Sequence, residues 1–274
     1  MARLTRIALG VIVPMVLLLY LIQDKLIYHP RPYPAAMVIP AEIEALPYAT
    51  AQGQQLAFYR GPAAPERMWV VFGGNASLAL EWYHLIAEAK DPSAGFLLID
   101  YPGYGTCGGK PSPSTMRANA DGALAALAER QGRPLADLER HLRVLGHSLG
   151  AGVALDFARG HPCERAVLVA PFTSLRDMAW RTVGWPLNWL LKANLDNRAR
   201  IRELLARESP PGIVIYHGDA DEVIPVAMGR ELARLFPAIV YHEARGSTHN
   251  RINDDQRPAL LAEISLPDTA VHGP

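Results

Sequence analysis

Short apolar runs alternate with longer amphipathic runs along most of the chain. The apolar runs are rich in Val, Ile, Leu and Phe, as expected for strands buried on both faces, and the longer runs favour helices. The alternation predicts an α/β fold whose mostly parallel sheet carries helices on both faces. The predicted strands cover residues 68–72, 96–99, 141–145, 166–169, 213–216 and 239–242. The predicted helices cover residues 79–90, 116–129, 151–158, 228–235 and 256–264.

Two further segments complete the predicted fold. Residues 48–50 and 55–59 flank Gly53 and favour a hairpin, which brings the predicted sheet to eight strands. Residues 172–202 are longer than a crossover requires and hold three of the five tryptophans. We predict that they form a small helical cap after the sixth strand. The cap either covers an apolar substrate pocket or packs its aromatic rings on the core.

The N-terminus carries an apolar run, residues 7–22, which follows Arg3 and Arg6 and has no charge before Asp24. A membrane-spanning helix needs about 20 apolar residues, so this run is short unless its flanks extend it. A cleaved signal peptide and a buried helix are the alternatives. Because no small-residue cleavage site follows the run, the sequence favours an uncleaved signal anchor.

The anchor sets the predicted domain organisation. Basic residues before the apolar run predict a cytoplasmic N-terminus and place the α/β domain on the non-cytoplasmic side. Lys25 and Arg31, just after the run, weaken that orientation. Residues 1–28 form the anchor in this scheme, and residues 29–47, with five prolines, are typical of a semi-rigid linker. Residues 48–274 form the α/β domain, with the cap inserted at about residues 172–202.

Composition excludes several classes of protein. Lys+Arg and Asp+Glu each number 27 in 274 residues, so the formal net charge is zero, and no basic stripe with interleaved aromatics suggests nucleic-acid binding. No Cys/His cluster has metal-ligand spacing, and no glycine-rich phosphate loop follows the first buried strand. We therefore expect neither a metal nor a cofactor.

The strongest chemical signal is Gly146-His147-Ser148-Leu149-Gly150, between the predicted strand 141–145 and the predicted helix 151–158. A nucleophile elbow has this arrangement, because a sharp strand-to-helix turn holds the serine in a strained backbone conformation. Glycines on both sides avoid collisions with neighbouring backbone. The pattern predicts Ser148 as a nucleophile, which then needs a base, an acid and an oxyanion hole.

His249 is the expected base among nine histidines. A serine hydroxyl is a poor nucleophile at neutral pH and needs an adjacent base. His249 follows the last predicted strand through a short polar loop and precedes the last predicted helix, which puts it at the carboxyl edge of the sheet beside the elbow. His242 falls within or at the end of that strand, so we expect it to be structural.

The acid that orients the base should come from residues 217–225, the loop after the preceding strand. Asp219, Asp221 and Glu222 are all in reach. The chain order serine, acid, histidine is the one expected for this arrangement. The loop alone leaves the choice among the three acids open.

The oxyanion of a tetrahedral intermediate needs preorganised N–H donors. One is expected from the backbone of Leu149, at the positive end of the elbow helix. The other is expected from the backbone of Asn75 in the loop of residues 73–77, where glycines let the main chain approach a substrate. The same loop is compatible with an ordinary helix cap.

Together these segments resemble the α/β-hydrolase superfamily, and most of all its membrane-anchored serine hydrolases, which include acyl-protein thioesterase-like and serine aminopeptidase-like enzymes. The resemblance implies that Asp221 is the acid, His249 the base, and Asn75 and Leu149 the oxyanion donors. It rests on the order and combination of residues 71–76, 100–105, 146–150, 171–175 and 217–225.

One departure from the family pattern concerns the oxyanion loop. The family commonly has His-Gly before the oxyanion residue, whereas this chain has Gly73-Gly74. The loop therefore lacks an imidazole that could stabilise it by a hydrogen bond.

The expected function is that of a serine hydrolase that cleaves a carboxylic ester or thioester through an acyl-enzyme, without a cofactor. Its substrate would be an acyl-containing small molecule, a lipid or an acylated protein. Two alternatives stay open. One is a serine peptidase or amidase that uses the same triad, and the other is a non-catalytic, membrane-associated scaffold.

Overall fold

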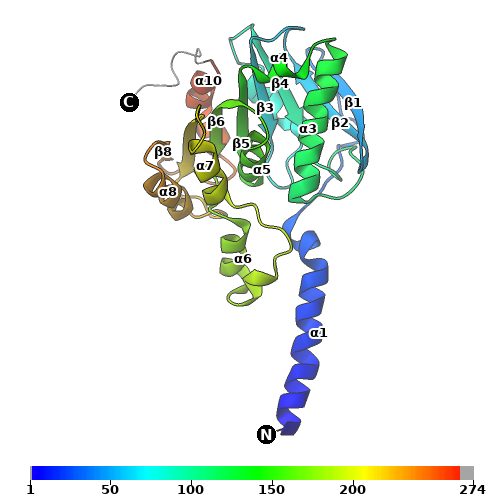
Figure 1. Ribbon diagram of the computed structural model, residues 1–274, viewed down its shortest axis with the longest axis vertical. Helices are drawn as coiled ribbons and strands as arrows, with labels where there is room; N and C mark the ends of the chain where they lie inside the picture. Colours follow the sequence, from blue (N-terminus) through cyan, green and yellow to red (C-terminus); the bar gives the residue numbers. More distant parts are fainter. Residues whose placement is uncertain (1, 266–274) are drawn as a thin grey trace.

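An eight-stranded sheet forms the centre of the molecule in the computed structural model, which describes residues 2–265 (Figure 1). Its strand order is β1-β2-β4-β3-β5-β6-β7-β8. The strands are β1 (Glu44–Thr50), β2 (Gly53–Arg60), β3 (Arg67–Phe72), β4 (Ala94–Ile99), β5 (Leu142–His147), β6 (Cys163–Val169), β7 (Gly212–Gly218) and β8 (Val240–Ala244).

The strand directions confirm the α/β-hydrolase architecture expected from the sequence. The predicted hairpin is the antiparallel pair β1 and β2, and β2 also pairs antiparallel with β4. From β4 through β3 to β8 every neighbouring pair is parallel. β1 begins at Glu44, inside the segment predicted as a linker. Pro47 is tolerated there because β1 is an edge strand, where a missing N–H need not break the ladder.

Helices cover both faces of the sheet and bury two separate hydrophobic clusters. On one face lie α3 (Pro113–Arg130), α4 (Leu135–Glu139), α5 (Leu149–Ala158), α7 (Asn197–Leu205) and α8 (Val226–Leu235). The other face is covered by the 3₁₀-helix η1 (Ala79–Trp82) and by α2 (Tyr83–Ile86), α9 (Ile252–Asp255) and α10 (Arg257–Ser265). The single helix predicted over residues 79–90 is thus two short turns.

A small helical segment follows the sixth strand, as expected. It consists of α6 (Leu175–Val183) and the 3₁₀-helix η2 (Leu187–Leu190), and it projects from the carboxyl edge of the sheet (Figure 1). Trp180, Trp185 and Trp189 are all largely exposed. These rings therefore do not pack on the core, which was one of the two roles that the sequence left open for them.

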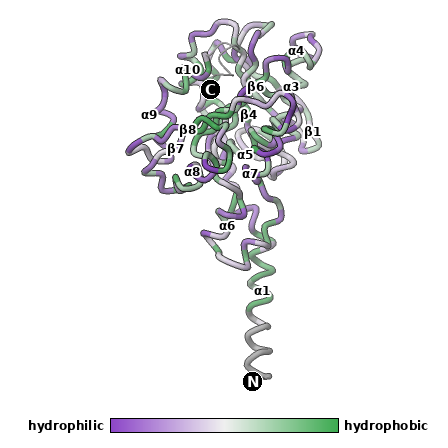
Figure 2. Tube along the Cα trace, turned by 60° about the vertical axis from the view of Figure 1, so that its left-hand side comes forward, coloured by the Kyte–Doolittle hydropathy of each residue, from purple (hydrophilic) through white to green (hydrophobic). Residues whose placement is uncertain are grey.

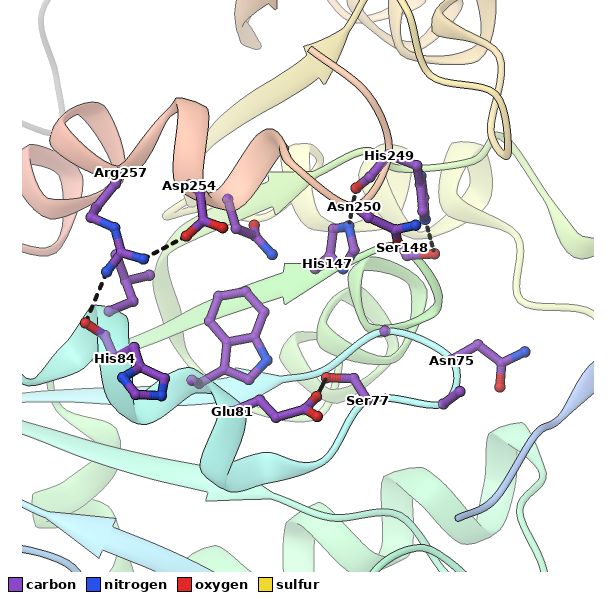
Figure 3. Close-up of a pocket in the computed structure, with 15 residues that line it drawn as sticks. Asn75, Ser77, Glu81, His84, His147, Ser148, His249, Asn250, Asp254 and Arg257 are labelled. Carbon is purple, nitrogen blue, oxygen red and sulfur yellow. Dashed lines mark hydrogen bonds and ion pairs between the residues drawn. The ribbon is translucent and has the colours of Figure 1, made fainter. Parts of the chain in front are cut away.

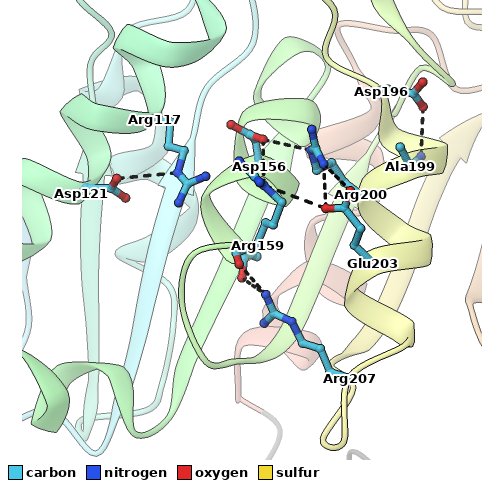
Figure 4. Close-up of polar contacts among 10 residues, drawn as sticks. Arg117, Asp121, Asp156, Arg159, Asp196, Ala199, Arg200, Glu203 and Arg207 are labelled. Carbon is cyan, nitrogen blue, oxygen red and sulfur yellow. Dashed lines mark hydrogen bonds and ion pairs between the residues drawn. The ribbon is translucent and has the colours of Figure 1, made fainter.

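The cap returns to the sheet through α7, which a polar network joins to the elbow helix α5 (Figure 4). Asp156 on α5 forms ion pairs with Arg200, across 3.0 Å, and with Arg159, across 3.5 Å. Arg200 also pairs with Glu203 across 2.6 Å. Arg207 donates to the carbonyl oxygen of Arg159 across 2.6 Å. The base of the cap is thereby held against the helix that begins beside Ser148.

The N-terminal helix α1 (Ala2–Ile27) extends away from the α/β domain, and only its C-terminal turns lie beside α6 and η2 (Figure 1). Figure 2 colours these turns mainly as hydrophobic residues. Within the described residues, no helix combines the length and the apolar character that crossing a membrane requires. The membrane-spanning segment expected from the sequence is therefore not supported.

Residues 28–43 join α1 to the sheet and lie along the α/β domain. The hydroxyl of Tyr33 donates to the Asp100 carboxylate across 2.7 Å. Arg31 forms an ion pair with Glu81, and its carbonyl oxygen accepts from the backbone N–H of Gly105 across 2.9 Å. The connection is thus fastened to the carboxyl edge of the sheet.

Candidate active site

Ser148 occupies a tight turn between β5 and α5. Its φ of 55° lies in the left-handed region, which costs a non-glycine residue of the order of 1–3 kcal/mol. The backbone N–H of Ser148 donates to the carbonyl oxygen of Val169 across 2.9 Å, which fastens the turn to the neighbouring strand β6. The side chain is thus presented at the carboxyl edge of the sheet, as an elbow requires.

The two glycines around Ser148 are required by close backbone contacts. A Cβ at Gly146 would lie 2.4 Å from the carbonyl oxygen of Gly150, and a Cβ at Gly150 would lie 2.2 Å from the carbonyl oxygen of Phe72. Both distances are far below van der Waals contact with atoms that cannot rotate away. The helix α5 can therefore begin immediately against the end of β3 only because these positions lack side chains.

Ser148, His249 and Asp221 form one chain of hydrogen bonds. The Ser148 hydroxyl donates to His249 Nε2 across 3.0 Å, and His249 Nδ1–H donates to Asp221 Oδ2 across 2.8 Å. This tautomer follows from Asp221, whose ionised carboxylate can only accept. All three side chains are buried or nearly so. The structure thus brings together the three residues that the sequence predicted as nucleophile, base and acid.

Asp221 is held ionised although it is shielded from solvent. Burial alone would raise the pKa of its carboxyl group, but hydrogen bonds from His217 and His249 hold that pKa well below its usual range. Its Oδ1 also accepts from the backbone N–H groups of Val223, across 2.9 Å, and Ile224, across 2.7 Å. A negative charge fixed in this way can stabilise an imidazolium on His249.

The two other acids of the same loop also support the His249 loop, through its backbone. Asp219 accepts from the backbone N–H of Gly246 across 2.6 Å, and Glu222 accepts from the backbone N–H of His249 across 3.3 Å. Both acids thus contact main-chain N–H groups rather than the imidazole ring of His249. The alternative histidine, His242, lies in β8 and stacks on Tyr216 with ring centroids 4.8 Å apart, consistent with a structural role.

His147, the residue before the nucleophile, holds the loop that carries the base. Its Nε2–H donates to the backbone carbonyl oxygen of His249 across 3.2 Å, and the two rings lie 4.9 Å apart. Burial, together with the neighbouring His249, lowers the pKa of His147 to about 4. His147 is therefore a neutral ring at neutral pH and adds no positive charge beside the base.

The loop of residues 73–77 is stabilised without the imidazole that the family pattern would supply. The hydroxyl of Tyr101 donates to the carbonyl oxygen of Gly73 across 2.7 Å. The Asn75 side chain donates to the carbonyl oxygen of Ile27 across 2.6 Å and accepts from the Tyr104 hydroxyl across 2.8 Å. Buried tyrosines and the end of α1 thus fix the loop.

The two residues expected to supply the oxyanion donors, Asn75 and Leu149, line the apolar side of the site together with Ser148. Leu149 is the first residue of α5, where backbone N–H groups have no partner within the helix. Asn75 and Ser148 line the same two pockets. Both expected donors thus belong to segments that border the nucleophile.

Ser148 opens on one side into a pocket of about 520 Å³ lined mainly by polar side chains (Figure 3). We call it the polar pocket, and its members include Glu81, His84, Asn250, Asn253, Asp254 and Arg257. Arg257 donates to the carbonyl oxygen of His84 across 2.9 Å and pairs with Asp254 across 2.5 Å. The positive charge of Arg257, at the start of α10, is thus balanced by an acid of the preceding helix α9.

On its other side Ser148 opens into a pocket of about 420 Å³ whose walls are mainly aliphatic. We call it the apolar slot, and its members include Leu19, Ile27, Leu175, Met178, Ala179 and Leu190. The slot lies between α1 and the cap. The sequence suggested an apolar pocket under the cap, but the lining is aliphatic rather than tryptophan-rich.

Sequence reasoning missed three contributions to this site. The second position of the elbow motif can hold many residue types, so the sequence gave no sign that His147 would bind the His249 loop. His217 lies near the end of β7, just before the loop that carries the expected acid, and its Nε2 is 3.4 Å from the Asp221 carboxylate. Its place in the sequence could have suggested this proximity. Nothing in the sequence indicated that α1 would form one wall of the apolar slot. No group of three or more acidic, His or Cys side chains suited to a metal ion occurs between residues 2 and 265.

Comparison with known proteins places the chain in a family. A model of the alpha/beta hydrolase family matches residues 69–263. An uncharacterized protein of Mycobacterium tuberculosis is 30% identical over 222 residues, which cover 77% of this chain and 74% of the relative. The lysophosphatidylserine lipase ABHD12 of Danio rerio is 30% identical over 161 residues, which cover 52% of this chain and 40% of that protein.

Solved structures agree on the fold. The esterase Pf2001 of Pyrococcus furiosus superposes with a TM-score of 0.65 at 13% identity, covering 87% of this chain and 96% of the esterase. At that identity the likeness concerns architecture alone. The family model covers the strands from β3 onward, the elbow and the loops of the expected acid and base. The chain therefore belongs to the alpha/beta hydrolase family.

Proposed function

We propose that this protein is a serine hydrolase that cleaves a carboxylic ester or thioester through an acyl-enzyme. The observation that carries the proposal is the hydrogen-bonded chain from Ser148 through His249 to Asp221, at 3.0 and 2.8 Å. Membership of the alpha/beta hydrolase family supports hydrolysis, and the strained backbone of Ser148 supports a working nucleophile rather than a structural serine.

Acylation follows from the geometry. The Ser148 Oγ attacks the carbonyl carbon of the substrate while His249 Nε2 takes the hydroxyl proton. The carbonyl oxygen becomes an oxyanion, which the backbone N–H groups of Asn75 and Leu149 stabilise. Each such donor is worth about 3–4 kcal/mol in the transition state. His249 then gives the proton to the departing alkoxide or thiolate, and the acyl group stays on Ser148.

Deacylation reuses the same groups. A water molecule entering through the polar pocket gives a proton to His249 and attacks the acyl carbon, and His249 returns that proton to Ser148 Oγ as the carboxylic acid leaves. Asp221 keeps its charge throughout and stabilises the imidazolium formed in each half-reaction. Because the neighbouring His147 ring is neutral, it does not repel the positive charge of that imidazolium.

Amide hydrolysis by the same triad is the second candidate, and a scaffold without activity is the third. The acids of the polar pocket, Glu81 and Asp254, are already paired with arginines. Among the residues that the structure describes, no acidic side chain lines the apolar slot to bind a free α-amino group. This favours an ester or thioester over an aminoacyl amide. A scaffold has no need for an ionised Asp221 and a strained Ser148 in hydrogen-bond reach of one histidine.

Labelling with a small fluorophosphonate tests the proposal. The wild type should be labelled on Ser148, located by peptide mass spectrometry, and should hydrolyse p-nitrophenyl acetate. Ser148→Ala should lose both activities. Ser77→Ala, which removes the other serine lining the polar pocket, should still be labelled on Ser148. Equal labelling of the wild type and Ser148→Ala would contradict the proposal.

Attachment to a membrane through the N-terminal helix stays a proposal, as does a non-cytoplasmic catalytic domain. It is supported by the exposed leucines of α1, among them Leu17, Leu18 and Leu21. The full-length protein should remain in a carbonate-washed membrane pellet, and a triple replacement of these leucines by Gln should release it. Retention of the triple variant would contradict attachment through this helix.

A further inference from the structure

The walls of the apolar slot come from two segments that are remote in the sequence. One wall is the C-terminal part of α1, where Leu19, Leu26 and Ile27 face the slot. The opposite wall is the cap, where Met178 and Ala179 of α6 are among the lining residues. Figures 1 and 2 show α1 and α6 side by side in two different views. Neither segment alone would enclose the space.

Gln23 ties the two walls together. Its amide donates to the carbonyl oxygen of Leu190 across 3.1 Å, and its carbonyl oxygen accepts from the backbone N–H of Lys192 across 2.8 Å. Lys192 also forms an ion pair with Asp24 across 3.1 Å. Gln23 is almost fully buried, which is unusual for a polar residue on an apolar helix. The tie fixes the width of the slot.

The inner end of the slot is the nucleophile itself. Ser148 and Leu149 line it, together with Asn75 of the oxyanion loop. A carbonyl carbon placed at Ser148 Oγ therefore has an aliphatic space on one side and the polar pocket on the other. An acyl chain avoids water only in the slot, whereas an alcohol or thiol leaving group with polar substituents finds partners in the polar pocket.

We propose that the apolar slot is the binding site for a linear fatty acyl chain, and that α1 is one of its specificity-determining walls. The inference rests on the proposed function and names the substrate class of the same site. A volume of about 420 Å³ lies within the ~300–1,000 Å³ range of small-molecule sites. It is far more than an acetyl group fills. In this proposal the acyl chain extends from Ser148 into the space between α1 and α6.

A series of p-nitrophenyl esters from acetate to dodecanoate tests the substrate class. Each methylene that leaves water on binding can raise kcat/KM by about fourfold. In the wild type kcat/KM should therefore rise at least tenfold from acetate to octanoate. A flat profile, or one that falls beyond acetate, would overturn the acyl-chain assignment.

Two tryptophan substitutions on α1 test the role of the helix. Leu19→Trp places a large ring in the slot and should lower the ratio of octanoate to acetate kcat/KM by about tenfold or more. Leu18→Trp makes the same change one residue earlier, where the side chain is largely exposed and does not line the slot. It should keep the wild-type ratio. Equal ratios of octanoate to acetate kcat/KM in the two variants would show that α1 does not contact the acyl chain.

A substitution from the opposite wall provides an independent check. Ala179→Trp on α6 should lower the same ratio, because the chain is proposed to run between the two walls. The rate of fluorophosphonate labelling of Ser148 reports whether each variant is folded with a working triad. If that labelling persists while all chain-length ratios stay at the wild-type value, the slot assignment fails and the triad stands. If the wild type is neither labelled nor active on acetate, the proposed function itself fails.

Discussion

The side-chain amide of Asn75 donates a hydrogen bond to the carbonyl oxygen of Ile27 across 2.6 Å, so the loop that carries an expected oxyanion donor is fastened to the last residue of α1. The same side chain accepts from the backbone N–H of His29 across 3.0 Å. Asn75 thus combines a backbone N–H that we propose as an oxyanion donor with a side chain bonded to the N-terminal segment.

Loss of this side chain should impair turnover more than binding. Asn75→Ala keeps the backbone N–H but frees the loop, so kcat should fall by about tenfold, because misplacement of a transition-state donor can cost up to about 10²-fold. KM for p-nitrophenyl acetate should change by less than about threefold, since the donor acts mainly in the transition state. Steady-state kinetics on the purified variant measure both.

Two tyrosines provide the comparison for this prediction. Tyr104→Phe removes one hydrogen bond to Asn75 and should show a smaller loss of kcat in the same direction. Tyr59→Phe removes the hydroxyl that donates to Pro62, far from the site, and should behave as wild type. An unchanged kcat in a folded Asn75→Ala variant would contradict the positioning role.

Asp221 and Asp219 should differ sharply although they lie two residues apart. Asp221→Asn leaves no charge to stabilise the imidazolium and favours the wrong tautomer of His249, so kcat should fall by about 10³-fold or more. Asp219→Asn keeps an oxygen for the Gly246 N–H and should cost less than about threefold. Single-turnover hydrolysis of p-nitrophenyl acetate measures both losses, and similar values for the two variants would exclude Asp221 as the acid.

His147 should make the folded state sensitive to mild acid. Its pKa is about 4 in the folded protein against an ordinary 6.5, so between these values the unfolded chain binds more protons than the folded one. The free energy of unfolding should therefore fall as pH falls, by about 3 kcal/mol between pH 6.5 and 4 from this residue. His147→Gln should lack this part of the decline in urea titrations. A parallel decline in both proteins would contradict the assignment.

His161 should show the opposite pH dependence. Burial disfavours its charged ring, but hydrogen bonds from that ring to Asp121, at 2.9 Å, and Glu139, at 2.6 Å, outweigh this and raise its pKa. The stabilisation is present below the ordinary pKa of about 6.5 and is lost as pH rises through the raised value in the folded protein.

The measurement compares His161→Gln with the wild type in urea at pH 6 and at pH 9. The variant should be less stable by about 1 kcal/mol more at pH 6 than at pH 9, near the upper range for partly exposed ion pairs. A difference between the two proteins that does not depend on pH would mean that His161 acts through packing against Phe157 instead.

The sheet and the elbow could be predicted because their sequence patterns have few physical alternatives. Runs such as residues 68–72 can be buried on both faces only inside a parallel sheet covered by helices. Glycines on both sides of Ser148 are demanded by backbone contacts shorter than 2.5 Å for any added Cβ. The acid was harder to choose, because three carboxylates share one loop. Of the three, Asp221 alone has a fully buried carboxylate, which accepts hydrogen bonds from the backbone N–H groups of Val223 and Ile224.

The contribution of α1 could not be predicted from its own residues. An apolar helix is equally compatible with lipid and with a protein surface, so residues 7–22 indicated an anchor and no more. The contact with the cap depends on the path of residues 28–43, which α/β periodicity does not specify. Gln23, a polar side chain just after the apolar run, is compatible with either environment and so does not decide between them.

The joint between α1 and the cap is made to main-chain atoms on the cap side, the carbonyl of Leu190 and the N–H of Lys192. Every residue type presents that carbonyl, and every type except proline presents that N–H. The side chains that line the apolar slot can therefore change in evolution without loss of these two hydrogen bonds. If the slot binds an acyl chain as we propose, chain-length preference can differ among related proteins, whereas Gln23 should be the most strongly retained position of α1.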